Sequence, residues 1–116
     1  MVDKQKLEQA MEQFKNCSPV FIALGDTTRQ KILMDLAEAG ESGINVAQLS
    51  GKSILSRPAI SHHLKVLKDS GLIEPVKKGT QIFYKLCLEH KLDSIKTLIQ
   101  MVEDIMKTMN KSVSTL

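Results

Sequence analysis

Aromatic residues and cysteines are scarce in this chain of 116 residues. It has no tryptophan, and aromatic residues make up only 3% of it, so a hydrophobic core must be built from aliphatic side chains and methionine. The two cysteines, Cys17 and Cys87, are too few for the disulfide framework of a small secreted protein. No apolar run reaches membrane-spanning length, and the residues after Met1 lack the apolar core of a signal peptide. We therefore expect one cytoplasmic domain.

The motifs of common enzyme sites are also missing. There is no glycine-rich phosphate loop and no paired catalytic constellation. Two of the three histidines, His62 and His63, lie on a predicted helix that has another explanation, given below. We therefore predict that the protein is not an enzyme, with no catalytic residue and no cofactor.

The excess of positive charge is confined to the middle third of the chain. The whole chain has 16 lysines and arginines against 13 acidic residues, a net charge of +3. Residues 51–88 hold seven basic and two acidic residues, whereas residues 1–50 have a net charge of −2 and residues 89–116 are neutral. A localised basic surface indicates a polyanionic partner, although lysines spread over any solvated face would give the same count.

This basic third contains a predicted helix with two different faces. Ser56 is a suitable N-cap, Pro58 fits the first turn, and Gly71 is a natural stop, so the helix is expected over about residues 56–70. Apolar residues that recur at the helical period predict one buried stripe. These residues are Ile60, Leu64 and Leu67.

The opposite face carries hydroxyl, imidazole and cationic groups, with an arginine near its N-terminal end. Such a face is typical of a helix that enters the DNA major groove. An ordinary amphipathic surface helix also carries lysines, so this face alone leaves both interpretations open. The candidate DNA-binding residues are Ser56, Arg57, Pro58, Ser61, His62, Lys65 and Lys68, with Lys77 and Lys78 in the hairpin that follows.

The rest of the chain reads as helices followed by a hairpin. Helices are expected over about residues 3–16 and 26–39, and a short one begins over residues 44–49. Residues 16–19 are predicted to break the first helix before a short apolar segment, residues 20–24. After Gly71 the pattern changes to period two and predicts strands over residues 72–76 and 82–86, with Pro75 placing the first at a sheet edge.

These elements together predict a winged helix-turn-helix, mainly α with a small β-hairpin, in the α+β class. The helix-turn-helix is expected over about residues 46–70 and the wing over about 72–87. We expect residues 1–110 to form a single DNA-binding domain and residues 111–116 to be a frayed tail.

Two segments carry specific motifs: residues 23–33 read ALGDTTRQKIL, and residues 55–73 read LSRPAISHHLKVLKDSGLI. Together these segments resemble the ArsR/SmtB family of bacterial repressors. The spacing between the two segments fits the family without gaps, and the resemblance covers about residues 18–88. It implies a homodimeric winged-helix repressor that binds double-stranded DNA and loses affinity for its operator when an inducer binds. The resemblance leaves the inducer unidentified.

The resemblance also implies roles for individual residues. Ser56 and Ser61 would contact phosphates or base edges. Arg57 stands where the family often has glutamine, and a bidentate contact to guanine would give about 1–3 kcal/mol of discrimination. Lys77 and Lys78 would reach phosphates or the minor groove.

Three further positions qualify this picture. Thr80 stands where the family commonly has arginine, which weakens the case for a minor-groove arginine. His63 is expected nearer the core edge than the groove. Arg29 either contacts phosphate or forms an ion pair or cap with Asp26.

This chain lacks the residues that form the metal-sensing sites of the family. Where the family's metal sensors carry Cys-Val-Cys, this chain has Asn45-Val46-Ala47, and the last predicted helix has His90 but no second histidine. We therefore predict no metal site. Cys17 and Cys87 leave open a dithiol redox switch, the alternative being that both are structural.

The last predicted helix, about residues 89–109, has a wider apolar face than a small core needs. With the first helix it predicts a two-fold dimer interface, unless this face simply covers its own domain. A dimer would present two copies of the helix at about residues 56–70, the candidate recognition helix, to the two half-sites of an imperfect inverted repeat. The centres of these half-sites would lie about one helical turn of DNA apart. The candidate interface residues are Leu7, Met11, Phe14, Leu92, Ile95, Ile99, Val102 and Met106.

The favoured function is a dimeric transcriptional repressor. A redox-sensing repressor of the same fold is one alternative. A winged-helix protein-interaction module without sequence-specific DNA binding is the other, and Arg57, Ser61 and His62 argue against it.

Overall fold

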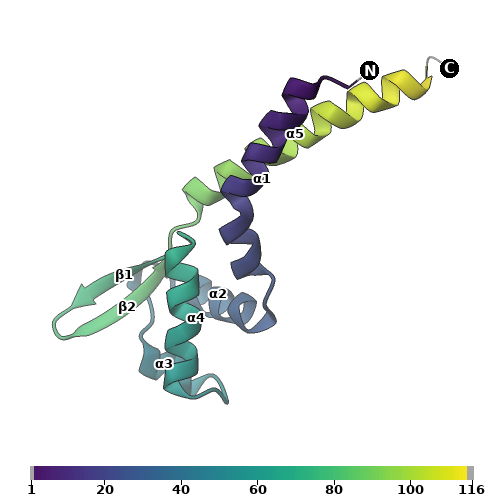
Figure 1. The fold of residues 1–116 in the computed structure, drawn as a ribbon. Helices are drawn as coiled ribbons and strands as arrows, with labels where there is room; N and C mark the ends of the chain where they lie inside the picture. Colours follow the sequence, from purple (N-terminus) through teal and green to yellow (C-terminus); the bar gives the residue numbers. More distant parts are fainter. Residues whose placement is uncertain (1, 115–116) are drawn as a thin grey trace. The chain divides into compact units, whose positions relative to one another are not determined.

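The computed structural model describes the backbone of residues 2–114 and the side chains of residues 2–110 (Figure 1). Within these residues, five α-helices and one short 3₁₀ helix accompany a single antiparallel hairpin, which confirms the predicted α+β winged helix-turn-helix. The elements in chain order are α1 (Lys4–Leu24), α2 (Thr27–Ala39), η1 (Gly40–Ser42), α3 (Val46–Gly51), α4 (Arg57–Asp69), β1 (Ile73–Lys78), β2 (Gln81–Leu86) and α5 (Glu89–Ser114).

The contacts divide the chain into two compact units. We call Met1–Ser18 with Glu89–Leu116 the terminal-helix unit, and Pro19–Leu88 the winged-helix unit. In the terminal-helix unit, the first part of α1 lies alongside α5 (Figure 1). None of the helices within residues 2–114 is long and apolar enough to cross a membrane.

The predicted break of the first helix at residues 16–19 is wrong, because α1 continues through Pro19 to Leu24. A proline inside a helix removes one backbone hydrogen bond. The residues that follow offset this loss by burial, since Val20 and Ala23 are at most 2% exposed. The apolar segment that we expected to stand alone is therefore the last turn of α1.

The last helix is longer than predicted. Its backbone is helical to Ser114, five residues past the expected end at residue 109. Residues 110–114 contain neither glycine nor proline, so nothing local stops the helix there. The predicted frayed tail therefore overlaps α5 at residues 111–114, and residues 115 and 116 lie outside the described part of the chain.

The winged-helix unit is built around an aliphatic core, as its composition requires. Side chains from α2, α3, α4 and the first strand of the hairpin meet there, each at most 5% exposed. The predicted buried stripe of α4 is confirmed. The core residues are Ile32, Leu33 and Leu36 from α2, Leu49 from α3, Ile60, Leu64 and Leu67 from α4, and Leu72 and Ile73 at the start of the hairpin.

The hairpin is tighter than predicted and is joined to the segment before α3. Lys78 pairs with Gln81, so the strands extend into the expected loop and leave Gly79 and Thr80 as the turn. Ile44 exchanges two backbone hydrogen bonds with Tyr84, of 2.9 and 3.0 Å. A Cβ atom at Gly43 would lie 2.8 Å from the Tyr84 carbonyl oxygen, so only glycine permits this close approach.

Candidate nucleic-acid interface

The recognition helix α4 starts as its sequence predicts. The Ser56 side chain accepts a hydrogen bond of 3.3 Å from the backbone N–H of Ala59, which makes Ser56 the N-cap. Pro58 lies in the first turn, where its missing N–H costs nothing. The short helix before it begins with a capping box formed by Asn45 and Gln48. Both helices of the helix-turn-helix therefore have defined N-termini.

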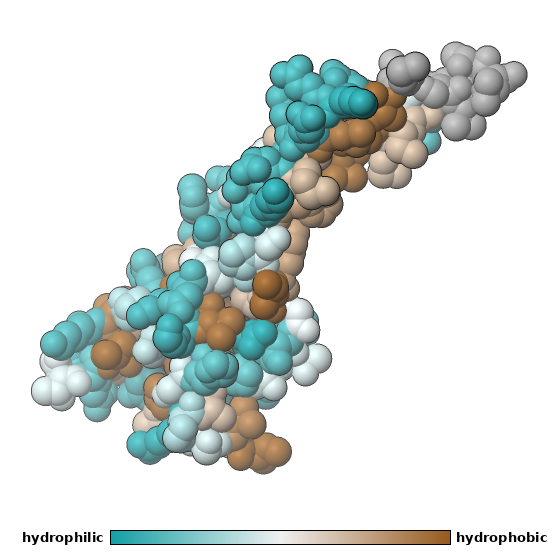
Figure 2. Space-filling model, in the orientation of Figure 1, coloured by the Kyte–Doolittle hydropathy of each residue, from teal (hydrophilic) through white to brown (hydrophobic). Residues whose placement is uncertain are grey.

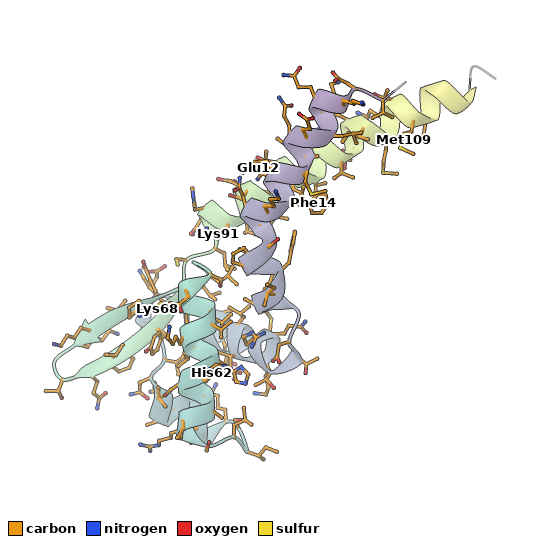
Figure 3. The ribbon with its side chains drawn as sticks, in the orientation of Figure 1. Glu12, Phe14, His62, Lys68, Lys91 and Met109 are labelled. Carbon is orange, nitrogen blue, oxygen red and sulfur yellow. The ribbon has the colours of Figure 1, made fainter. Side chains whose placement is uncertain are left out.

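The polar face of α4 is open to solvent. All seven residues that the sequence assigns to it are exposed, and Figure 3 shows two of them, His62 and Lys68, along the helix. Within the described residues, the side chains of Arg57 and Ser61 form no hydrogen bond or ion pair. Their donor groups are therefore available to base edges and phosphates.

One cation of this face is already paired. Lys65 Nζ lies 2.7 Å from Asp69 Oδ2, and this hydrogen bond lowers the pKa of Asp69. Both side chains are more than half exposed, and exposed pairs of this kind are weak. A phosphate could therefore replace Asp69 as the partner of Lys65.

The two lysines near the tip of the wing differ in their surroundings. Lys77 is exposed and, among the described residues, forms no ion pair. Lys78 donates a 2.6 Å hydrogen bond to the Ser42 carbonyl oxygen and lies 4.6 Å from the centre of the Phe83 ring. Lys78 therefore fixes the wing to η1, and a phosphate contact would require this bond to break.

A lysine at the base of the wing makes a second link to η1. Lys85 Nζ lies 2.9 Å from Glu41 Oε2 and 3.3 Å from Glu74 Oε1. The cross-strand partner Glu74 follows from the hairpin register, whereas nothing in the sequence pattern indicates Glu41. The sequence analysis missed this cluster, which orients the wing beside α4.

Replacing Lys85 by methionine is expected to speed amide hydrogen exchange in β1 and β2 but not in α4, because the link to η1 is lost. Hydrogen bonds to Glu41, and then to Glu74, raise the pKa of Lys85 above 10.5. The link therefore contributes fully below pH 10.5 and is lost as the pH rises through the raised value. Lys77→Met is the matched control, and equal exchange rates in both variants would contradict the anchoring role.

The half-buried Arg29 side chain supports the fold of the winged-helix unit through hydrogen bonds to the backbone. Its guanidinium donates to the carbonyl oxygens of Ala23, at 2.8 Å, and Ile22, at 3.0 Å, at the end of α1. Its backbone N–H donates to Asp26, which caps α2, and this bond lowers the pKa of Asp26. Of the two predicted roles for Arg29, the structure therefore shows the cap.

The same guanidinium reaches the recognition helix. Arg29 Nη1 lies 3.3 Å from His63 Nδ1. Because arginine has no acceptor, Arg29 is the donor in this contact and His63 Nδ1 the acceptor. His63 is half-buried, as expected for a residue at the core edge, while His62 is exposed. Arg29 thus joins the end of α1, the start of α2 and the middle of α4.

Comparison with known proteins identifies this arrangement. The family model for bacterial regulatory proteins of the arsR family matches residues 26–74. The HTH-type transcriptional regulator MJ1325 of Methanocaldococcus jannaschii is 35% identical over 95 residues, which cover 82% of this chain and 100% of that protein. The chain belongs to the ArsR family.

Two further relatives agree with this assignment. The transcriptional repressor SdpR of Bacillus subtilis is 36% identical to this ArsR-family chain over 83 residues, which cover 72% of the chain and 89% of SdpR. The structure of an ArsR-like transcriptional regulator from Rhodococcus sp. RHA1 matches with a TM-score of 0.75 and 27% identity, over 91% of this chain and 97% of that one.

Membership of the ArsR family makes the protein a DNA-binding transcriptional regulator and not an enzyme. The fold provides the elements for this function, a capped recognition helix with an exposed polar face and a wing beside it. The resemblance in residues 23–33 and 55–73 is therefore confirmed as family membership.

Neither cysteine of this ArsR-family protein forms a disulfide within the chain. Cys17 is 1% exposed, and its thiol donates to the Ser94 carbonyl oxygen at 3.5 Å. Cys87 is half-buried and donates to the Gly71 carbonyl oxygen at 3.5 Å. The burial of Cys17 argues against a redox switch, which needs an accessible thiolate. Among the described side chains, no group of three histidine, cysteine or acidic residues is placed to hold a metal ion.

Proposed function

We propose that the protein is a homodimeric repressor that binds an imperfect inverted repeat and leaves it when an inducer binds. As a DNA-binding regulator it would act in the cytoplasm. The observation that carries the proposal is the exposed face of α4, where Arg57 and Ser61 present unoccupied donors at the N-terminal half of the helix. In helix-turn-helix proteins this end of the recognition helix reads base edges.

The residues proposed to bind DNA divide by role. Arg57, Ser61 and His62 would read bases, and Ser56, Pro58, Lys65 and Lys68 would lie against the backbone at the groove edges. Lys77 would neutralise a phosphate, and Lys78 would do so only after leaving Ser42.

Dimerisation is supported by apolar surface that the terminal-helix unit leaves open. Ala10 and Leu98 are buried, and Gln13 Nε2 donates to the Ser94 carbonyl oxygen at 2.8 Å. Six of the eight candidate interface residues are nevertheless between 44% and 57% exposed, namely Leu7, Met11, Phe14, Leu92, Ile99 and Met106. Figure 2 shows hydrophobic residues gathered along α5. Ile95 and Val102 lie half-buried on the same helix.

A second copy of the chain is the proposed occupant of this surface. Two apolar stripes that face each other across a two-fold axis would remove both from water. The same axis would set two α4 helices into successive turns of the major groove, which suits an inverted repeat. The proposed inverted-repeat operator therefore depends on the proposed dimer.

Replacing Ile99 by glutamate is expected to convert the dimer to a monomer, because a carboxylate would be buried in an apolar interface without a partner. Light scattering after size-exclusion chromatography measures the mass directly. Met34→Glu is the matched control, because Met34 is 64% exposed but lies on α2, outside this stripe. A parent protein of monomer mass at micromolar concentration would contradict the proposal.

The repressor function is tested with the region upstream of the protein's own gene. DNase I footprinting should show two protected half-sites with centres about one helical turn apart, and transcription from that promoter should fall as protein is added. A footprint with no preferentially protected site at any protein concentration would instead support the protein-interaction module.

A further inference from the structure

The turn between α3 and α4 carries an isoleucine whose side chain is entirely in water. Ile54 is 104% exposed, more than any other large hydrophobic residue among the described side chains. Its neighbour Leu55 takes the inward position instead and lines a small cavity with Leu49 and Ile60. Ile54 therefore has no part in the core, and exposing it is unfavourable in the free protein.

The backbone around Ile54 is nevertheless well fixed. The Lys52 N–H donates to the Leu49 carbonyl at 3.0 Å, and the Leu55 N–H donates to Ser53 Oγ at 3.0 Å. Two residues after Ile54, Ser56 caps the recognition helix. The side chain is thus presented from an ordered turn, and a ligand would find it already in place.

The surroundings of Ile54 favour nucleic acid over an apolar protein partner. Lys52, Ser56 and Arg57 are all exposed within three residues of it. Lys52 Nζ lies 3.8 Å from Glu38 Oε2, an exposed and therefore weak pair, while Arg57 has no ion-pair partner among the described residues. It also lies at the end of α4 that faces base edges in a helix-turn-helix complex. The one apolar group in the DNA major groove is the C5-methyl group of thymine.

We propose that Ile54 reads a thymine methyl group in each half-site of the operator. The turn then contributes to specificity by apolar contact, while Arg57 does so by hydrogen bonding. This proposal rests on the proposed function, because it needs α4 to lie in the major groove. The sequence analysis did not single out Ile54, because this residue precedes the helix whose pattern was used.

Single replacements of thymine by uracil in the operator test the proposal, because uracil keeps every hydrogen-bonding group and lacks only the methyl. Parent protein should bind about fourfold more weakly at one thymine position per half-site, the factor expected for one buried methyl group. Ile54→Ser should lose this preference, and Ile54→Val should keep it. Both variants should have the melting temperature of the parent, because Ile54 makes no core contact.

Met34→Ser is the matched control, since it removes another exposed apolar side chain and should leave the thymine preference intact. If parent protein binds the operator specifically but tolerates uracil at every position, the role of Ile54 is overturned and the repressor function is not. If Ile54→Ser weakens binding to thymine and uracil duplexes equally, the methyl contact is likewise overturned. A parent protein without operator preference would overturn the proposed function and this inference with it.

Discussion

Replacing Arg29 by methionine is expected to lower the free energy of unfolding by about 2–3 kcal/mol, because hydrogen bonds from a charged donor are worth about 1.5–3 kcal/mol. The two carbonyl groups at the end of α1 would lose their donor, and His63 Nδ1 would lose its partner. Arg29→Lys should recover part of the loss, since an ammonium group cannot reproduce the planar fork. Urea denaturation followed by circular dichroism measures the difference.

The neighbouring residue provides a matched control. Gln30 Nε2 donates to the Leu24 carbonyl at 2.7 Å on the exposed side of the same turn. This is one neutral hydrogen bond in water, so Gln30→Ala should cost about 1 kcal/mol or less. If Arg29→Met lowers the free energy of unfolding no more than Gln30→Ala does, the contacts of Arg29 with α1 and α4 do not stabilise the fold as proposed.

Replacing Arg57 by alanine is expected to relax operator preference by about 1–3 kcal/mol at one base pair, the value of a bidentate contact to guanine. Arg57→Lys should keep the charge but lose the preference, because it cannot form two parallel bonds. Binding to a panel of operators with single base changes measures this effect. A panel in which Arg57→Ala keeps the preference of the parent would contradict the placement of Arg57 at a base edge.

Lys77→Ala should behave differently from Arg57→Ala. It should weaken binding to all duplexes alike and reduce the slope of log K against log salt by about 1, because it removes one phosphate contact. Lys96→Ala on α5 is the control and should change neither quantity. The two variants together separate base reading by α4 from phosphate binding by the wing.

The sequence was sufficient where local signals decide the structure. Ser56, Pro58 and Gly71 set the limits of the recognition helix, and the 3.6-residue period of Ile60, Leu64 and Leu67 set its buried side. The change to period two after Gly71 located the wing, and the glycine turn closed it.

The sequence failed where contacts between distant segments decide. Pro19 looked like a helix end, but burial of Val20 and Ala23 carries α1 past it. Arg29 could be assigned a cap but not its bonds to Ile22 and Ala23, because these depend on how α1 ends. The same holds in the wing, where the links from Lys78 and Lys85 to η1 have no local sequence pattern.

These links between distant segments fix the positions of α4 and the wing. Arg29 contacts His63 on α4, and Lys85 joins the base of the wing to η1, so both elements proposed to bind DNA are positioned before DNA arrives. Preorganisation of this kind reduces the entropy that binding must overcome. Under the proposed function, an inducer would then act by changing the position of whole elements and not the contacts of single side chains.

The most direct test is a fluorescence-anisotropy titration of two labelled duplexes of equal length and composition at one fixed salt concentration. One duplex carries the region upstream of the protein's own gene, and the other carries the same bases in scrambled order. An ArsR-type repressor should bind the first at least about 10³-fold more tightly, with two chains per duplex. Equal affinity for both duplexes would contradict sequence-specific binding through α4.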